Sequence, residues 1–307
     1  MLRATRTSMQ PKVLVRILGG LGNQLFAYAA ARRLALVNNA ELVIDDISGF
    51  PHDTWYLRHY QLDHFAILCR KAKAAERLEP FSRIRRHLLR RWNRRLPFEQ
   101  RRYLVQEGID FDPRLLDVRP TAWMFLEGYW QSEGYFKDVQ SQIRKDLIIH
   151  PPTDATNLSF ADRIRQHQAV AVHVRFFDNP NSVVDAIGNN VPGGYYHRAI
   201  RAMDARVSGA HYFLFSDRPE DARSLIPLSD DRATLVHHNQ GDANAYADLW
   251  LMTQCKHFII ANSTFSWWGA WLAKSMDKVV IAPAFEKRVG SCSWGFKGLL
   301  PQEWLLV

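Results

Sequence analysis

Short runs of β-branched and other apolar residues alternate along the chain with longer segments in which apolar residues recur every three or four positions. Residues 12–18 and 41–45 read KVLVRIL and ELVID and predict strands, with a helix between them from Ala27. The second half repeats the rhythm, with strands predicted at 169–176, 211–217, 233–239, 257–262 and 278–283 and helices at 195–207, 243–255 and from about residue 265. Strands separated by helices of this length indicate parallel sheets.

A polar stretch near residues 151–168, opened by Pro151 and Pro152, interrupts this alternation. We therefore predict an N-terminal domain over 1–152 and a C-terminal domain over 153–307, each close to the usual domain size. The fold class is α/β, with two Rossmann-like domains whose parallel sheets face a central cleft. The last helix is a candidate to pack back on the N-terminal domain.

Composition excludes several classes of protein. The chain has 307 residues, of which 47% are hydrophobic and 23% charged, values that do not fit a disordered, collagenous or coiled-coil chain. It contains no apolar run long enough for a membrane span, and its first ten residues lack the apolar core of a signal peptide. Three scattered cysteines are too few for a disulfide framework or a zinc site. We expect a cytoplasmic, reduced protein.

The net charge of +9 is concentrated in one segment. Residues 70–102 hold thirteen Lys or Arg and three Glu, a net of +10, so the remaining chain sums to −1. Within residues 83–102, a predicted helix has an apolar stripe flanked by arginines; the stripe is Ile84, Leu88, Trp92 and Leu96. The stripe either packs on the domain core, or the helix lies on an anionic membrane or holds an acidic polymer. Nothing resembling a base-reading module accompanies the charge, so we expect no nucleic-acid partner.

Ligands of open parallel sheets bind beyond the carboxyl ends of the strands. The segment GGLGNQLF follows the first predicted strand, where Gly20 and Gly22 allow close approach of the backbone to a ligand. Leu25 stands where a dinucleotide fingerprint needs its third glycine, which argues against a nicotinamide cofactor. We expect Asn23 and Gln24 to point their amides at a ligand. The alternative is that these glycines serve only to pack a helix end.

His173 and Arg175 lie on one side of a predicted strand, and Asp178 follows it. A buried arginine is costly unless it meets an anion, and the guanidinium suits phosphate. A histidine alone in such a strand is more often a core residue, but together with Arg175 it indicates an anion site.

A second dense motif is HFIIANSTFSWWGAWLA, in which an apolar strand runs into residues that begin a helix. A helix start with hydroxyl side chains is a ready phosphate site, although simple capping is the alternative. The candidate binding residues here are Asn262, Ser263, Thr264, Phe265 and Ser266, while the tryptophans are predicted core. Ser216 and Asp217 end another strand, where the carboxylate either accepts from a guanine edge or caps a loop.

The blocks LGGLGNQLFAYAAARRLA, LEGYWQSEGYF, HVRFFD, FLFSD and LWLMTQCKHFIIANSTFSWWGAWLA follow one another as in the α-1,2-fucosyltransferases. Over roughly residues 13–285 the chain resembles a bacterial-type member of glycosyltransferase family 11. The resemblance implies a GT-B-like fold and inverting transfer of L-fucose from GDP-fucose to the 2-hydroxyl of a terminal β-galactoside, in surface glycan or O-antigen synthesis. It implies no metal and no cofactor beyond this donor substrate, and a galactose-terminated or lipid-linked acceptor glycan as the partner.

The resemblance also implies residue roles. The arginine matched by Arg175 contacts the donor diphosphate, and the positions matched by Asn262 to Thr264 and by Ser216 and Asp217 belong to the donor pocket. Where the family usually has Arg-Arg-Gly-Asp-Tyr, the chain has Arg175 followed by Phe176, Phe177, Asp178 and Asn179. One cation is thereby lost. Asp178 and His173 are candidates for the catalytic base, and Asn23 for positioning the acceptor.

Two other functions compete with this interpretation. Asp110 and Asp112 have the spacing of the acidic pair in a metal-dependent transferase, although Pro113 follows them. Ten tryptophans and the basic segment would also suit a non-catalytic carbohydrate- or polyanion-binding protein.

Overall fold

The computed structural model describes residues 10–51, 53, 54, 56–177, 190–288 and 293–307. The chain divides into two compact units. Unit 1 comprises the residues up to Gly19 together with Gln24–Tyr60 and Ile67–Asp146, and unit 2 comprises Gly20–Asn23, Gln61–Ala66 and Leu147–Val307. Two short pieces of unit 2 thus come from residues that the sequence analysis placed in the N-terminal domain.

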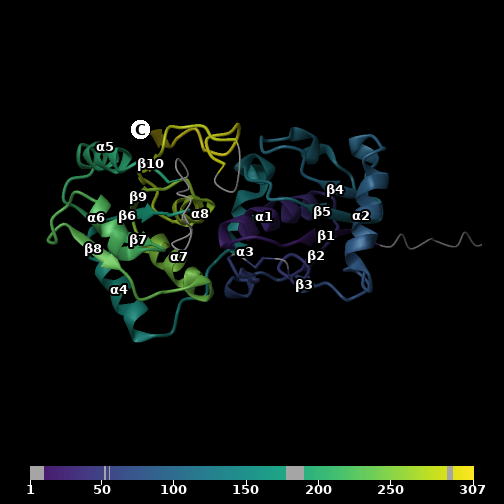
Figure 1. Cartoon of the computed structure of the whole chain (residues 1–307), viewed down its shortest axis with the longest axis horizontal. Helices are drawn as coiled ribbons and strands as arrows, with labels where there is room; N and C mark the ends of the chain where they lie inside the picture. The colour runs from purple at the N-terminus through teal and green to yellow at the C-terminus, as the bar shows by residue number, and fades with distance from the viewer. Residues whose placement is uncertain (1–9, 52, 55, 178–189, 289–292) are drawn as a thin grey trace, which may run out of the picture. The chain divides into compact units, whose positions relative to one another are not determined.

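Unit 1 is built on a five-stranded parallel sheet in the order β3-β2-β1-β5-β4 (Figure 1). Its strands are β1 (Lys12–Arg16), β2 (Glu41–Asp45), β3 (Arg70–Lys71), β4 (Tyr103–Val105) and β5 (Trp123–Glu127). Its helices are α1 (Leu21–Val37), α2 (Ser82–Asn93) and α3 (Gln140–Asp146). Asp146 at the end of α3 accepts hydrogen bonds from Tyr28 and Arg32, which fixes α1 to α3.

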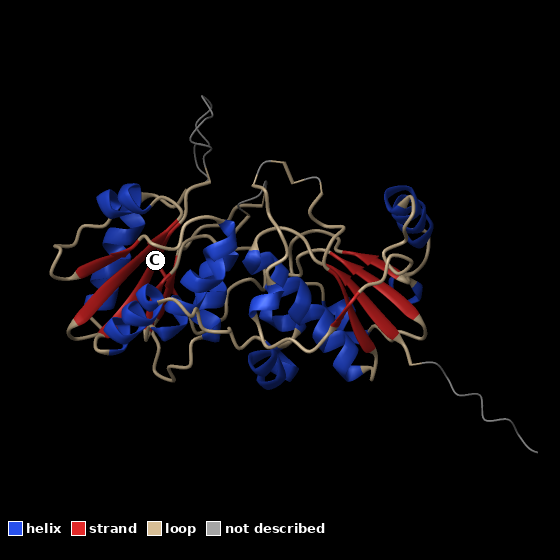
Figure 2. Cartoon of the chain, turned by 90° about the horizontal axis from the view of Figure 1, so that it is seen from below, coloured by secondary structure: helices blue, strands red, loops and turns tan. Residues whose placement is uncertain are grey.

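Unit 2 has a six-stranded parallel sheet in the order β11-β10-β9-β6-β7-β8. Figure 2 shows the strands in red and the helices in blue. Its strands are β6 (Gln168–Val174), β7 (Ala210–Ser216), β8 (Ala233–Val236), β9 (His257–Ile259), β10 (Val280–Ala282) and β11 (Leu305–Leu306). Its helices are α4 (Ala155–Arg165), α5 (Gly193–Asp204), α6 (Pro219–Leu225), α7 (Ala245–Gln254) and α8 (Thr264–Leu272). Short 3₁₀ turns occur along the chain at Leu62–His64, Phe98–Gln100, Pro113–Asp117, Glu133–Tyr135, Lys137–Val139 and Asp242–Asn244.

The alternation of side chains along β6 decides which of them reach the functional edge of this sheet. Val170, Val172 and Val174 belong to the same buried apolar cluster as the inner residues of α5. His173, between two of these valines, therefore points to the opposite face. Trp267, Trp268 and Trp271 of α8 are buried, as predicted for core residues.

The α/β prediction with two parallel sheets is confirmed, but two local predictions were wrong. Helix α1 begins at Leu21, six residues before the expected start, so Gly22 and Asn23 lie in its first turn rather than in a loop. The polar stretch near residue 151 contains helix α4, whose N-cap Asp154 accepts from the backbone N–H of Asn157 at 2.9 Å.

Helix α2 is present, and of the alternatives left open for its apolar stripe the structure contradicts packing on the core. Ile84, Leu88 and Trp92 are each more than half exposed, whereas Arg86 and Asn93 are buried. Carboxylates at the ends of two strands explain the reversal, because a buried carboxylate requires a cation. Arg86 donates to Asp45 at the end of β2, and Arg90 donates to Glu127 at the end of β5.

None of the described helices is both long and apolar enough to cross a bilayer.

Candidate active site

The carboxyl ends of β6 and β7 bring together the charged residues predicted from the second half of the chain. These strands pair in register, with Val174 opposite Ser216, so the residues that follow them emerge side by side. An Nη1 atom of Arg175 lies 2.8 Å from Oδ2 of Asp217, and the backbone N–H of Phe176 donates to the same carboxylate at 3.2 Å. Arg175 and Asp217 therefore form one charged pair at the sheet edge.

Asp217 is held in a partly desolvated environment. Burial raises the pKa of its carboxyl group, and Arg175 only partly offsets that rise. Ser216 is buried, and its Oγ accepts from the backbone N–H of Arg218 at 3.0 Å, which shapes the turn after β7. The carboxylate is thus presented at the edge by a fixed turn.

Phe176 and Phe177, which follow Arg175, both lie beneath guanidinium groups. Arg218 stacks over the ring of Phe176 at 4.5 Å, and Arg175 over that of Phe177 at 5.6 Å, measured from the guanidinium carbon to the ring centroid. Cation–π contacts of this kind orient an arginine without neutralising it. Sequence reasoning missed Arg218, although its position directly after the FLFSD block was a usable signal.

His173 is a buried, neutral imidazole at this edge. Burial, with a smaller contribution from Arg175, lowers its pKa to about 3. Its ring centroid lies 5.4 Å from that of Phe265, and its Nδ1 has no hydrogen-bond partner among the described residues. A buried polar atom without a partner is rare, so a ligand group that bonds to Nδ1 would remove an energetic cost.

The N-terminus of α8 adjoins His173 through that aromatic contact. Ser263 is the N-cap, and its Oγ accepts from the backbone N–H of Phe265 at 3.3 Å. The first N–H groups of a helix have no carbonyl partner within it and carry partial positive charge. Ser266 is buried and donates its hydroxyl to the Ser263 carbonyl, and Asn262 is buried just before the cap. The arrangement suits an anion beside Arg175.

The first turn of α1 packs directly on this helix start, within unit 2. Thr264 donates its hydroxyl to Oδ1 of Asn23 at 3.0 Å, and Nε1 of Trp268 donates to the Gly22 carbonyl at 3.0 Å. A Cβ atom at Gly22 would lie 2.5 Å from the carbonyl carbon of Thr264. Gly22 therefore serves the approach of two helix ends, which is the packing alternative left open by the sequence.

Two other residues of the GGLGNQ segment have local roles. The backbone carbonyl of Gly20 accepts from the N–H of Asn23 at 2.9 Å. Gln24 is fully buried, and its side-chain NH₂ donates to the carbonyls of Gly19 and His59 inside unit 1. The Gln24 amide therefore points to these backbone carbonyls, whereas we expected it to point toward a ligand. Asp178 lies outside the described residues.

Comparison with known proteins identifies the family. Residues 84–288 match the family model described as glycosyl transferase family 11. The chain belongs to this family. The matched part includes β6, β7 and the start of α8, so the charged edge described above lies inside it.

Two relatives of this family-11 glycosyltransferase match it over most of their length. An α-1,2-colitosyltransferase from Escherichia coli is 29% identical over 279 residues, covering 88% of this chain and 91% of the relative. The O-antigen biosynthesis glycosyltransferase WbnK from Escherichia coli is 27% identical over 288 residues, covering 86% and 91%. Among solved structures, the fucosyltransferase NodZ from Bradyrhizobium is similar with a TM-score of 0.49 at 15% identity, covering 87% of this chain and 96% of that one.

Membership of a glycosyltransferase family excludes the non-catalytic interpretation. The acidic pair of the metal-dependent alternative is used otherwise, because Asp112 caps the turn Pro113–Asp117 and its carboxylate accepts from Arg114. Among the described residues, no group of three His, Cys, Asp or Glu side chains is placed to hold a metal ion.

Unit 1 has a separate pocket at the carboxyl ends of β1, β2 and β5, with a volume of about 600 Å³. Arg16 and Glu127 end two of these strands and form an ion pair of 3.0 Å across the pocket wall. Arg90 and the hydroxyl of Tyr103 also bind Glu127, and despite burial these partners hold the pKa of Glu127 below its usual value. Glu127 is therefore a charged residue held in place in the wall, and no sequence pattern pointed to it.

Proposed function

We propose that this family-11 enzyme transfers L-fucose from GDP-fucose to the 2-hydroxyl of a terminal β-galactoside, forming an α-1,2 linkage with inversion, during O-antigen or other surface glycan synthesis. The observation that carries the proposal is the charged edge of unit 2. There, Arg175, neutral His173 and the N-terminus of α8 provide cationic and N–H groups for a diphosphate, and no described carboxylate cluster is available for a metal to do so.

The roles follow from the charge that develops during transfer. As the bond between the anomeric carbon and GDP breaks, negative charge grows on the β-phosphate, and the guanidinium of Arg175 with the N–H groups of Thr264 and Ser266 stabilises it. We assign His173 a hydrogen bond to the donor rather than proton abstraction, because a group with a pKa near 3 binds a proton weakly at neutral pH. Asp217 and Ser216 are proposed to recognise the guanine end of the donor.

Asn262, Ser263 and Phe265 belong to the same proposed donor site through the position of the α8 start. Asn23 acts on it indirectly, since its carbonyl oxygen accepts the Thr264 hydroxyl. We therefore propose that Asn23, Gly20 and Gly22 position α8, while Asp178 remains our candidate for the base. No metal ion takes part in the proposed reaction.

The acceptor is proposed to bind in the pocket of unit 1. Its wall exposes guanidinium, carboxylate and hydroxyl groups from Arg16, Glu127 and Ser48, which are groups that hydrogen-bond sugar hydroxyls. Ile47 lines this pocket and is half exposed, so a larger side chain there can fill the space without disturbing the core. Ile47→Trp should raise the KM for lactose while leaving the KM for the donor and the slow hydrolysis of the donor unchanged.

The relatives do not agree on the donor sugar. One is named a colitosyltransferase, and another, from Plecturocebus brunneus, is named galactoside α-(1,2)-fucosyltransferase 1. Colitose is fucose without its 3-hydroxyl, so a site that bonds this hydroxyl discriminates strongly between them. The test is a screen of GDP-fucose, GDP-colitose, GDP-mannose and UDP-galactose with lactose, with the product linkage assigned by NMR. Turnover with GDP-mannose or UDP-galactose but not with GDP-fucose would refute the proposed donor.

A further inference from the structure

The outward face of α2 is an apolar surface that no described part of the chain covers. Phe81 is 72% exposed, Ile84 and Leu88 are each 59% exposed, and Trp92 is 56% exposed. The last three recur every four residues, so they form one stripe along the helix, and Phe81 is the exposed N-cap residue directly before the first turn. We call these four residues the α2 stripe. Large apolar side chains gathered in this way mark an interaction site more often than isolated ones do.

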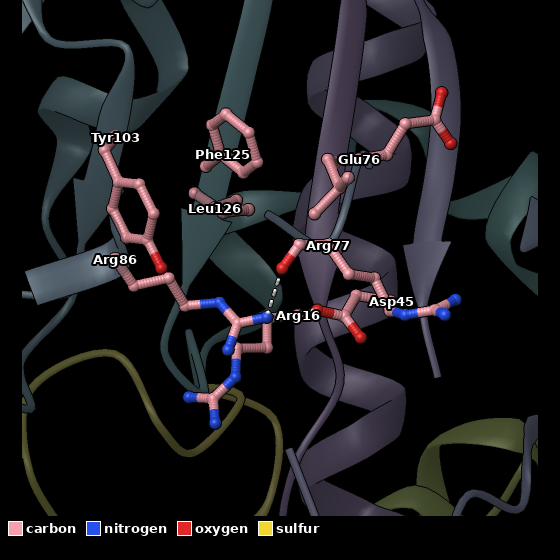
Figure 3. A pocket seen from close by; sticks show the side chains of 9 residues that line it. Arg16, Asp45, Glu76, Arg77, Arg86, Tyr103, Phe125 and Leu126 are labelled. Carbon is pink, nitrogen blue, oxygen red and sulfur yellow. Dashed lines mark hydrogen bonds and ion pairs between the residues drawn. The ribbon is translucent and has the colours of Figure 1, made fainter. Parts of the chain in front are cut away.

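The helix cannot hide this stripe by rotating about its axis. On the inward face, Arg86 donates to Asp45 at 3.2 Å and to the Arg77 carbonyl at 2.9 Å, as Figure 3 shows for the side chains around it. Arg90 binds both carboxylate oxygens of Glu127. Rotation would leave Asp45 without its cation and Glu127 with only one of its two arginines, Arg16, at a cost larger than the gain from burying the stripe.

Asn93 fixes the other end of the same helix. Its Oδ1 accepts from the backbone N–H groups of Arg102 and Tyr103, at 2.7 and 3.0 Å, and thereby ties the last turn of α2 to the start of β4. The exposed position of the stripe is thus determined by polar contacts along the whole helix.

A collar of cations surrounds the stripe. This collar consists of five exposed arginines, namely Arg83, Arg85, Arg91, Arg94 and Arg95. No Asp or Glu occurs between Pro80 and Glu99, and in the described part of the chain no ion pair joins these arginines to a carboxylate. The surface therefore combines apolar insertion with strong positive charge.

We propose that this surface docks on an anionic lipid bilayer, with α2 lying in the plane of the membrane. At twelve residues the helix is about 18 Å long, too short to span a bilayer but long enough to embed four side chains at the headgroup level. Arginine stems lie along the acyl boundary while their guanidinium groups reach the phosphates. A second copy of the chain is a poorer occupant, because its own collar would place five more arginines against these five.

The experiment is cosedimentation of the full chain with vesicles of phosphatidylglycerol and phosphatidylcholine, and with vesicles of phosphatidylcholine alone. The stripe variant is Ile84→Gln with Leu88→Gln and Trp92→Gln, and the collar variant is Arg91→Gln with Arg94→Gln and Arg95→Gln. Neither includes Arg86 or Arg90, whose contacts hold the fold. A matched control removes the same charge from exposed arginines of α5 and the turn that follows it, as Arg198→Gln with Arg201→Gln and Arg206→Gln.

The wild-type protein should bind the anionic vesicles and be released near 0.5 M salt, where the Debye length is only a few ångströms. The collar variant should lose affinity on the order of a hundredfold at low salt, and the stripe variant at least about tenfold. The α5 control should bind within about twofold of wild type. Transfer to soluble lactose should be equal in all four proteins, so this proposal stands or falls independently of the proposed reaction.

Equal vesicle binding by wild type, stripe and collar variants would overturn the proposal, as would no binding by the wild type. A concentration-dependent dimer that the stripe variant cannot form, measured by light scattering in the absence of lipid, would assign the surface to a second copy instead.

Discussion

Replacing Arg175 by alanine tests the proposed donor site most directly. The change removes a guanidinium proposed to meet the growing charge on the β-phosphate, and loss of one such group typically costs about 10²–10³ in rate, or roughly 3–4 kcal/mol. We therefore expect kcat/KM for GDP-fucose with lactose to fall at least about a hundredfold. Lysine should restore little of this, because an ammonium cannot bind two phosphate oxygens in the plane of a fork.

The structure predicts a separate effect of this variant on stability. Arg175 and Asp217 pair at 2.8 Å with side chains 20% and 29% exposed, so the alanine variant leaves a mostly buried carboxylate without its cation. Because both groups retain some solvent, we expect a loss of about 1–2 kcal/mol, below the 3–5 kcal/mol found for fully buried pairs. The melting temperature should fall by a few degrees, and the loss should grow as the pH rises through the pKa of Asp217.

The double variant Arg175→Ala with Asp217→Asn separates the two effects. An amide needs no cation, so the melting temperature should recover, while turnover should stay low because the phosphate still lacks its partner. Two results would refute the reasoning. One is an alanine variant within about threefold of wild-type kcat/KM, and the other is recovery of turnover in the double variant, which would show that Arg175 acts only by neutralising Asp217.

Three further predictions follow from the contacts described. Gly22→Ala places a Cβ 2.5 Å from the backbone of Thr264, so α8 must shift, and kcat should fall by about tenfold or more with a lowered melting temperature; an active variant of unchanged stability would contradict the proposed helix approach. Transfer should persist in excess EDTA. If chelation abolished the activity and Mn²⁺ restored it, the metal-dependent alternative with Asp110 and Asp112 would be supported instead. Burial raises the pKa of Asp248 to about 7, against an ordinary value of 3.8, so its charged form is disfavoured in the fold and stability is lost as pH rises from about 4 to 7. Asp248→Asn should therefore melt at a higher temperature than wild type at pH 8 and at nearly the same temperature at pH 4, measured by calorimetry. Equal dependence of the melting temperature on pH in the two proteins would show that folding does not raise the pKa of Asp248.

The residues at the charged edge of unit 2 could be predicted from sequence because the signals there are local. Each candidate stands at the end of an apolar run or directly after it, and in a parallel sheet all such positions fall on one edge. His173, Arg175, Ser216 and Asp217 were found in this way. The pairing of Arg175 with Asp217 could not be predicted, since it depends on β6 and β7 being neighbours.

The orientation of α2 was beyond the reach of sequence patterns for a different reason. A helical wheel separates an apolar face from a polar one but does not say which lies inward, and the usual assumption buries the apolar face. Asp45 and Glu127 reverse this choice, and they lie 41 and 37 residues away from their partners Arg86 and Arg90. Only the sheet order brings these two carboxylates under one helix.

The stacking of Arg218 on Phe176 has a consequence for exchanging motifs between members of this family. A guanidinium from the turn after β7 lies over the ring of Phe176, at the position where the resemblance to family 11 leads us to expect an arginine. Restoring the arginine there by a single substitution would place two like charges in the space of one and remove the ring that supports Arg218. Positions 176 and 218 should therefore be exchanged together. In a chimera that exchanges only one of them, any change in activity would reflect the broken Arg218–Phe176 contact and not the contribution of the motif itself.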